Sequence, residues 1–186
     1  MNWKGNLKKK LTAVLSAGVL AVTGTVSAMS GMTASAQPSA GTYGDALKLS
    51  LYFFDANQCG ADDNVLTWRG KCHTYDAEAS LSSAKGLSSS SVAAIKAANG
   101  GLDTVDVSGG YHDAGDHLKF SNTMGYSCTN LAWSYFENPD SYKETGSEDH
   151  LLYILKKMCD YFMKVTYLDD SGNVIAFCYM VGDDQD

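Results

Sequence analysis

The sequence predicts a mainly helical, all-α fold with long loops rich in glycine and aspartate. Apolar residues recur at spacings of three and four over several stretches, and the segments between these stretches are rich in Gly, Asp and Ser and show no period. The chain has 186 residues, 45% of them hydrophobic, and only 2 prolines. This composition is typical of an ordinary globular domain and excludes a disordered or fibrous chain.

The first 36 residues are predicted to be a secretory signal peptide. Lys4 and Lys8–Lys10 form a basic start, an apolar run extends from Leu11 to about Ala28, and Ala34-Ser35-Ala36 is a cleavage site. The alternative is a membrane anchor, but the run contains Ser, Thr and Gly and ends in small residues rather than basic ones. We therefore expect a secreted, extracellular or cell-surface protein with no membrane segment after cleavage.

The exported part is strongly acidic. Without the four N-terminal lysines, 10 basic side chains face 21 acidic ones, so the net charge falls from -7 for the whole chain to about -11. No basic cluster remains that could follow a phosphate backbone. We therefore exclude nucleic acid as a partner.

All five cysteines lie in the exported part, where an oxidising environment favours disulfides. Cys59 and Cys72 flank a polar loop, and they are the pair that we expect to form a disulfide. Cys128 and Cys159 fall in helical patterns and are expected to be small buried hydrophobic residues. Because the number is odd, at least one cysteine stays unpaired.

Four helices are expected after a short unstructured linker at residues 37–42. They cover residues 45–60, 88–101, 124–137 and 147–165. The second has a Ser88 cap and resembles a surface insertion, the third is ended by Asn138-Pro139, and the fourth follows a Ser147 cap. The fourth helix has the clearest apolar face: Leu151, Leu155, Met158, Phe162 and Val165. A turn at residues 169–173 leads into a run of strand type, Val174–Val181.

The residues that could carry chemistry lie in the glycine-framed loop Gly109–His117. Asp113 and Asp116 are three apart, so in a tight turn both could face one small volume, hold a water molecule and accept its proton. The alternative, that both are turn formers bonded to their own backbone, stays open from the pattern alone. A metal site at His112 and His117 is disfavoured because a spacing of five does not place two residues on one side of a helix. We therefore expect no metal ligands.

An ordered set of motifs extends on both sides of this loop. It comprises residues 106–120, Met124–Ser127, Leu131–Trp133, Val65–Gly70 and Tyr179–Asp183. Together these segments resemble the N-terminal signature of glycoside hydrolase family 9 cellulases, over residues 43–186. Two departures lie at the site: His112 stands where the family more often has Tyr or Trp, and Ser121–Thr123 replaces a more usual Gly-x-Pro.

The resemblance implies an inverting endo-β-1,4-glucanase whose catalytic domain is an (α/α) toroid of six helical hairpins. It places the general base at Asp116 and the residue that helps to hold the water at Asp113, and it assigns no substrate-binding residue. The implied substrate is cellulose or a related β-1,4-glucan. It also implies no cofactor for catalysis, a structural calcium that cannot be assigned to residues here, and carbohydrate-binding or dockerin-type modules downstream.

The proton donor of the resembled family is a Glu, and nothing in residues 117–186 resembles its motif. Glu137, Glu144 and Glu148 are expected to face solvent. Twelve helices of about 11 residues, joined by connections of about 4–6 residues, need on the order of 190 residues before any cleft loops are added. We therefore expect an N-terminal portion of a longer catalytic domain, inactive by itself.

A second class stays open, a secreted glucan-binding protein of the same descent that does not cut its ligand. Its binding platform would be Tyr111, Tyr126 and Trp133. Aromatic residues at helical spacing are more often core than sugar platform, and for Trp133 we expect the core.

Overall fold

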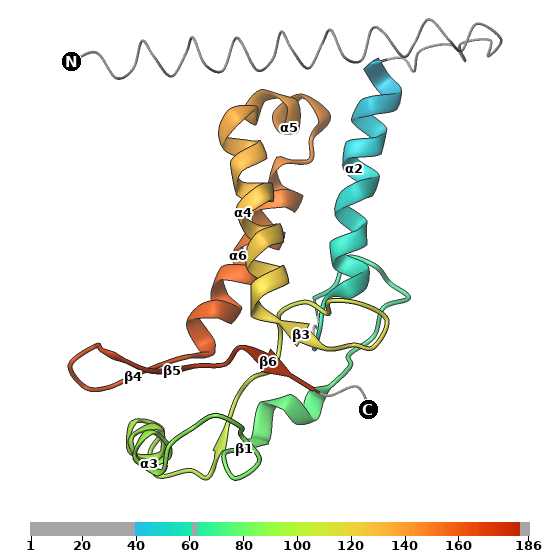
Figure 1. Ribbon diagram of the computed structural model, residues 1–186. Coiled ribbons are helices and arrows are strands. Elements are labelled where there is room, and N and C mark those ends of the chain that lie inside the picture. Colours follow the sequence, from blue (N-terminus) through green and yellow to red (C-terminus); the bar gives the residue numbers. More distant parts are fainter. Residues whose placement is uncertain (1–39, 61–62, 183–186) are drawn as a thin grey trace, which may run out of the picture. The chain divides into compact units, whose positions relative to one another are not determined.

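The computed structural model describes residues 40–60 and 63–182 (Figure 1). The expected signal peptide and the first part of the linker lie outside the described residues. A mainly helical fold is confirmed, with long helices α2 (Ala40–Asn57), α4 (Ser121–Glu137) and α6 (Glu148–Lys164). Shorter helices are α3 (Ser89–Ala98), α5 (Pro139–Thr145) and the 3-10 helix η1 (Thr74–Glu78). None of the helices in this part of the chain is long and apolar enough to cross a membrane.

Three short antiparallel strand pairs connect these helices, and only the strand run from Val174 was expected. β1 (Ala79–Ser80) pairs with β2 (Thr104–Val105), and β4 (Thr166–Leu168) pairs with β5 (Val174–Phe177). β3 (Lys119–Phe120) pairs with β6 (Met180–Val181). The expected strand run from Val174 is thus divided between two sheets. Strands of two to four residues are too short to show the alternation that reveals a strand in a sequence.

The core lies on the apolar face of α6, which packs against both α2 and α4 (Figure 1). The buried residues of α6 and of its C-cap are Leu151, Ile154, Met158, Tyr161 and Val165. The predicted face is therefore confirmed at Leu151, Met158 and Val165, whereas Leu155 and Phe162 are only half-buried. Leu51 of α2 and Met124 of α4 join the same cluster. Burying one such side chain contributes about 1.5–3 kcal/mol, so this face is the main source of stability of the helical part.

The helix ends differ from the prediction in three places. α2 begins at Ala40, so the end of the expected linker 37–42 is helical. α5 was not predicted, because Pro139 was read as a terminator, whereas the fixed φ of proline also suits the first position of a helix. Ser147 stands at the N-cap of α6 without capping it, since its hydroxyl group bonds to Thr145 instead.

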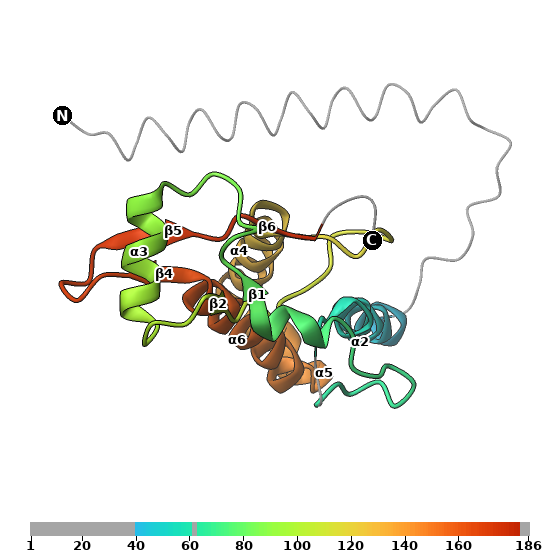
Figure 2. The ribbon, with the colours of Figure 1, turned by 90° about the horizontal axis from the view of Figure 1, so that it is seen from below.

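The expected insertion is anchored to the rest of the chain. Ser88 caps α3 as predicted, its hydroxyl oxygen accepting from the Ser91 N–H at 3.0 Å. Figure 2 shows α3 lying across the β4–β5 hairpin. Ile95 is buried there, so α3 belongs to the folded unit.

Three expectations about the aromatic side chains and the cysteines are wrong. Trp133 is 65% exposed and Tyr126 is 73% exposed, because both lie on the face of α4 that points away from α6, whereas Tyr111 is buried in the core. Cys159, expected to be buried, is exposed on α6, and Cys128 is half-buried. Cys59 and Cys72, expected to form a disulfide, are free thiols in the structure.

Candidate functional site

The loop that carries Asp113 and Asp116 connects β2 to β3, and its first part is joined to the end of α2. The Cys59 N–H donates to the Gly110 carbonyl at 2.9 Å, and the His112 N–H donates to the Asn57 carbonyl at 2.8 Å. Gly110 has φ +75°, and a Cβ placed there would come within 2.9 Å of the Tyr161 ring. Only glycine fits this position, because the loop lies directly against the core.

A buried lysine joins the two ends of the loop. The Lys119 ammonium group donates to the Asp76 carboxylate and to the Val107 carbonyl, both at 2.6 Å, and to the Gly109 carbonyl at 3.3 Å. It also lies 5.4 Å from the centre of the Tyr161 ring. Lys119 and Asp76 are both buried. A buried charge requires such partners, so this pair fixes where the loop begins and ends.

The tip of the loop is a tight turn. The Asp113 N–H donates to the Leu118 carbonyl at 2.7 Å, and the His117 N–H donates to the Ala114 carbonyl at 3.2 Å. The turn places the side chains of Asp113 and Asp116 in solvent. The loop therefore presents both carboxylates from an anchored base.

The two carboxylates differ in their hydrogen bonds. Asp116 Oδ1 accepts from the Leu118 N–H at 3.2 Å, the contact that the turn-forming alternative predicts. The Asp113 carboxylate accepts no hydrogen bond from any residue that the structure describes. The Asp113 carboxylate therefore has no turn-forming role, whereas the Asp116 carboxylate has one in addition to any chemical role.

Two hollows flank the loop, one beside each aspartate. Asp116 lines a pocket of about 220 Å³ together with His73, Asp76 and His117. Asp113 lines a smaller pocket of about 80 Å³, next to Asn57 at the end of α2. The expectation that both carboxylates face one small volume is not met by either pocket.

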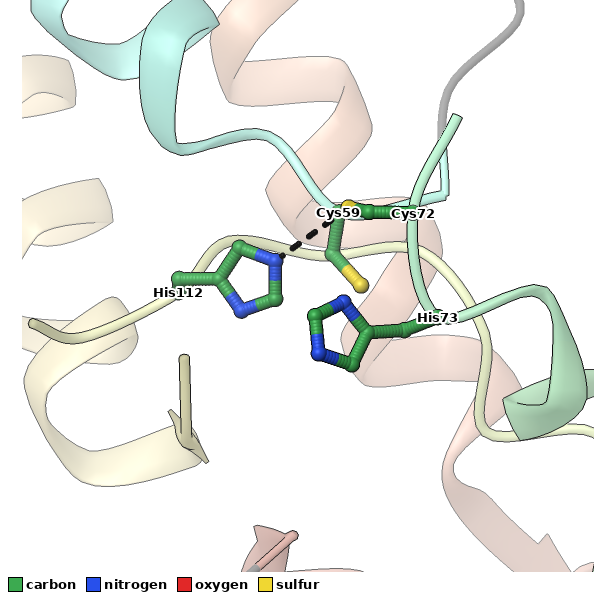
Figure 3. A group of neighbouring side chains, drawn as sticks. All are labelled: Cys59, Cys72, His73 and His112. Carbon is green, nitrogen blue, oxygen red and sulfur yellow. Dashed lines mark hydrogen bonds between the residues drawn. The ribbon is translucent and has the colours of Figure 1, made fainter. Parts of the chain in front are cut away.

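A cluster of possible metal ligands lies at the base of the loop (Figure 3). One donor atom from each of Cys59, Cys72, His73 and His112 lies within 4.8 Å of every other. The four residues come from three segments: the end of α2, the segment before η1, and the aspartate loop. Their side chains point toward one another (Figure 3). We call them the Cys/His cluster.

The contacts around the Cys/His cluster suit a zinc ion. His112 Nδ1 lies 2.6 Å from the His117 carbonyl, which directs the lone pair of Nε2 toward Cys72 Sγ at 3.5 Å. His73 Nδ1 is buried and has no hydrogen-bond partner among the described residues. Two thiols and two imidazoles are a common ligand set of structural zinc sites, with bonds of about 2.0–2.3 Å.

Burial keeps two members of the Cys/His cluster uncharged when no metal is bound. It lowers the pKa of His112 to about 4, and it raises the pKa of Cys59 to about 12. A neutral imidazole is the form that binds a metal, whereas a thiol must lose its proton to do so. The Arg69 guanidinium donates to Cys72 Sγ at 3.1 Å.

The Cys/His cluster is not apparent from the sequence, in which His117 is the histidine nearest to His112. His117 lies close by, with its ring centre 5.2 Å from that of His112, but it is not part of the cluster. The signal that could have found the cluster is the dipeptide Cys72-His73 together with a second cysteine 13 positions earlier. No local pattern connects these residues with His112, which is 40 positions from Cys72.

Three glutamates of the helical part, Glu137, Glu144 and Glu148, are far from the loop. Glu137 ends α4, which begins directly after β3 at the end of the loop, and a helix of 17 residues is about 25 Å long. Glu148 accepts from the Tyr135 hydroxyl group near the same end of α4 and is half-buried, whereas Glu137 and Glu144 are exposed as expected. None of these three side chains can lie opposite Asp116.

Comparison with known proteins gives the class of the chain. The family model described as glycosyl hydrolase family 9 matches residues 43–186. Among solved structures, the catalytic domain of Clostridium thermocellum CelT is 43% identical, with a TM-score of 0.71, covering 76% of this chain and 30% of that one. The cellulase Cel9M of C. cellulolyticum is 36% identical, with a TM-score of 0.56, covering 80% of this chain and 29% of that one.

The chain belongs to glycosyl hydrolase family 9. Curated relatives include Endoglucanase B of Cellulomonas fimi, 34% identical over 66% of this chain and 10% of the relative. Endoglucanase 10 of Arabidopsis thaliana is 32% identical over 76% of this chain and 22% of the relative. The chain therefore spans between a tenth and a quarter of the length of these relatives.

Proposed function

We propose that this chain is the base-carrying part of a secreted enzyme that hydrolyses internal β-1,4-glucosidic bonds of cellulose or a related glucan with inversion. The observation that carries this proposal is the anchored loop, which holds Asp113 and Asp116 in solvent on a base fixed by buried contacts. The relatives support the substrate class, since one structure of Cel9M is a complex with cellobiose. Within the complete domain, the helices described here would form part of a toroid of helical hairpins.

The chemistry assigns a different task to each aspartate. In an inverting glycosidase a carboxylate takes a proton from water on the face of the sugar opposite the leaving group, with the acid and base about 6.5–9.5 Å apart. We assign proton abstraction to Asp116, which lines the larger pocket, and orientation of the water to Asp113. The carboxylate of Asp113 has no competing hydrogen bond with the described residues, so it is free to accept one from water.

We expect the 186-residue chain alone to release no reducing sugar from carboxymethylcellulose. A base without an opposing acid cannot protonate the leaving oxygen, and the three C-terminal glutamates lie too far away. The assay compares the purified chain with a mock preparation, and retention of the chain on cellulose is measured in the same samples. Sugar release above the mock would show that the acid lies within this chain.

In the protein that carries the complete catalytic domain, Asp116→Asn should lower turnover by about 10²–10⁴-fold with little change in glucan binding. Asp113→Asn is the matched variant, and it should have a weaker or comparable effect. Azide should restore part of the turnover of Asp116→Asn, since a small anion can occupy the vacated space and attack the anomeric carbon.

Thermal unfolding of both variants separates catalysis from turn formation. Asp116 also accepts from the Leu118 N–H, and the amide oxygen of Asn can accept the same bond, so Asp116→Asn should cost little stability. The catalytic assignment fails if Asp116→Asn keeps most of its turnover, or loses it only in step with a large fall in melting temperature.

A second candidate function is glucan binding without cleavage, favoured by one observation. Tyr126 and Trp133 are both largely exposed and lie seven positions apart on one face of α4, where their rings could stack on a sugar chain. This function and hydrolysis differ in their test. A full domain that releases no reducing sugar, and whose retention on cellulose is lost in Trp133→Ala, would favour binding alone.

We propose in addition that the Cys/His cluster holds a structural zinc ion. Its ligands would be one atom each from Cys59, Cys72, His73 and His112. Because a structural zinc ion has four coordination positions, these ligands would leave none for a substrate. The zinc would join the end of α2, the segment before η1 and the aspartate loop. Since His112 directly precedes Asp113, the ion would hold the catalytic loop in place without taking part in the reaction.

A further inference from the structure

Helices α4 and α6 run antiparallel and face each other at matching positions. A Cβ placed on Gly125 of α4 would lie 3.9 Å from Cζ of Phe162 in α6. Further along, the Tyr135 hydroxyl group donates to the Glu148 carboxylate. Residue numbers therefore rise along one helix as they fall along the other.

Cys128 and Cys159 occupy the next matching position after Gly125 and Phe162. Cys128 lies one turn after Gly125, and Cys159 lies one turn before Phe162. The pKa of Cys128 is raised to about 11, first by burial and then by the Cys159 thiol. The two sulfur atoms are direct neighbours across the helix interface.

The spacing of the helices suits a covalent bond between the two cysteines. Packed helix axes are about 8–10 Å apart, and the Cα atoms lie on a radius of about 2.3 Å, so facing Cα atoms come within about 3.4–5.4 Å. A disulfide spans about 4.4–6.8 Å between Cα atoms. Gly125, one turn away, has no side chain that could hold the helices further apart.

The two cysteines are also distinct from the remaining thiols. Cys159 is exposed and Cys128 is half-buried, so a reagent in solution reaches Cys159 first. Cys59 and Cys72 belong to the Cys/His cluster, where a zinc ion would occupy them. The Cys178 thiol donates to the Met180 carbonyl at 3.5 Å, in the segment between β5 and β6.

We propose that Cys128 and Cys159 form an oxidation site, whose disulfide links α4 to α6 and is independent of glucan hydrolysis. The oxidant is a low-molecular-weight disulfide such as oxidised glutathione. The Cys159 thiolate attacks one sulfur of the oxidant, breaks its S–S bond and releases one glutathione thiolate. The Cys128 sulfur, after losing its proton to water, then attacks Cys159 and releases the second glutathione. Two protein thiols lose two electrons and two protons, which appear in two glutathione thiols.

The disulfide would close a loop of roughly 30 residues that contains the end of α4, all of α5 and most of α6. A loop of this size restricts the unfolded chain, so the oxidised protein should unfold at a temperature about 5–10 °C higher than the reduced one. The link would hold the helical layer without touching the aspartate loop.

Peptide mapping tests this pairing directly, because a Lys or Arg separates each cysteine from the next in the sequence. The folded chain is incubated with oxidised glutathione, its remaining thiols are alkylated, and it is digested with trypsin. We expect a disulfide between peptides 120–143 and 158–164, which contain Cys128 and Cys159. Cys178→Ser is the matched control and should keep this link.

Cys159→Ser removes an exposed sulfur and should fold normally, without the link and without the rise in unfolding temperature. Cys128→Ser should leave a glutathione adduct on Cys159. Three results would overturn the proposal. Both wild-type peptides could be recovered in alkylated form, either cysteine could be linked to another residue, or the link could form only between two chains. An unfolding temperature that rises equally in Cys159→Ser would do the same.

Discussion

The helical layer and the base of the aspartate loop are held together by different kinds of interaction. In the helical layer α2, α4 and α6 bury apolar side chains such as Leu151, Ile154 and Met158. The base of the loop, by contrast, buries Lys119, Asp76 and His112. Apolar packing tolerates many substitutions of similar volume, whereas a buried charge depends on one particular partner. The part of the molecule that positions the candidate catalytic residues is thus the part least tolerant of change.

The largest expected effect is at the buried ion pair. Lys119→Met leaves the Asp76 carboxylate buried without its partner, so we expect a loss of about 3–5 kcal/mol in the free energy of unfolding. The Val107 carbonyl also loses its donor. Urea unfolding of the variant and the wild type measures the difference.

Two further variants decide whether the loss arises from charge or from packing. Adding Asp76→Leu to Lys119→Met removes the unpaired charge and should restore part of the stability. Leu151→Ala in the helical layer should cost about 2–5 kcal/mol, through lost apolar contacts and a cavity. A cost of less than about 1 kcal/mol for Lys119→Met, or no recovery in the double variant, would remove the contrast between the two regions.

The same contrast explains what could be predicted from the sequence. The periodicity of α6 predicted its buried face, and the Ser88 cap predicted the start of α3, because both signals lie within a few residues. The base of the loop has no such signal, since Lys119 and Asp76 are 43 positions apart. The aspartate motif was recognisable through its resemblance to a family, but the Cys/His cluster depends on contacts that only the folded chain brings together.

Removing a bound metal should have the next largest effect. We expect the purified chain to contain one zinc ion, and a chelator to remove it. A ligand present at 100 times its dissociation constant adds about 2.7 kcal/mol to the free energy of unfolding, and this contribution should disappear with the metal. Metal analysis and urea unfolding, before and after dialysis against the chelator, measure both effects.

Cysteine variants locate the metal. Cys72→Ser should contain no zinc and should not respond to the chelator, whereas Cys178→Ser, outside the cluster, should behave like the wild type. Zinc that persists in Cys72→Ser, or a chelator effect restricted to the helical layer, would place the metal elsewhere.

The smallest expected effect is at an exposed ion pair that joins the segment after α2 to α6. Lys157 donates to both carboxylate oxygens of Asp63, at 2.7 and 3.0 Å, and this contact lowers the pKa of Asp63. Because both side chains are partly exposed, Asp63→Asn should cost less than about 1 kcal/mol at pH 7. Asp160→Asn, which breaks an exposed pair with Lys156 within α6, is the matched control.

The pH dependence of this small difference follows from the direction of the pKa shift. At acid pH the unfolded chain binds the proton of Asp63 before the folded chain does, so the pair stabilises the fold above the unfolded pKa of about 3.9. The contribution is lost as the pH falls through the lower, folded value. Urea unfolding at pH 7 and near pH 2 should therefore show a difference between wild type and Asp63→Asn only at the higher pH. High salt should reduce it at pH 7, because the pair is accessible to ions. A difference that persists at low pH would mean that Asp63 acts through its hydrogen bonds rather than its charge.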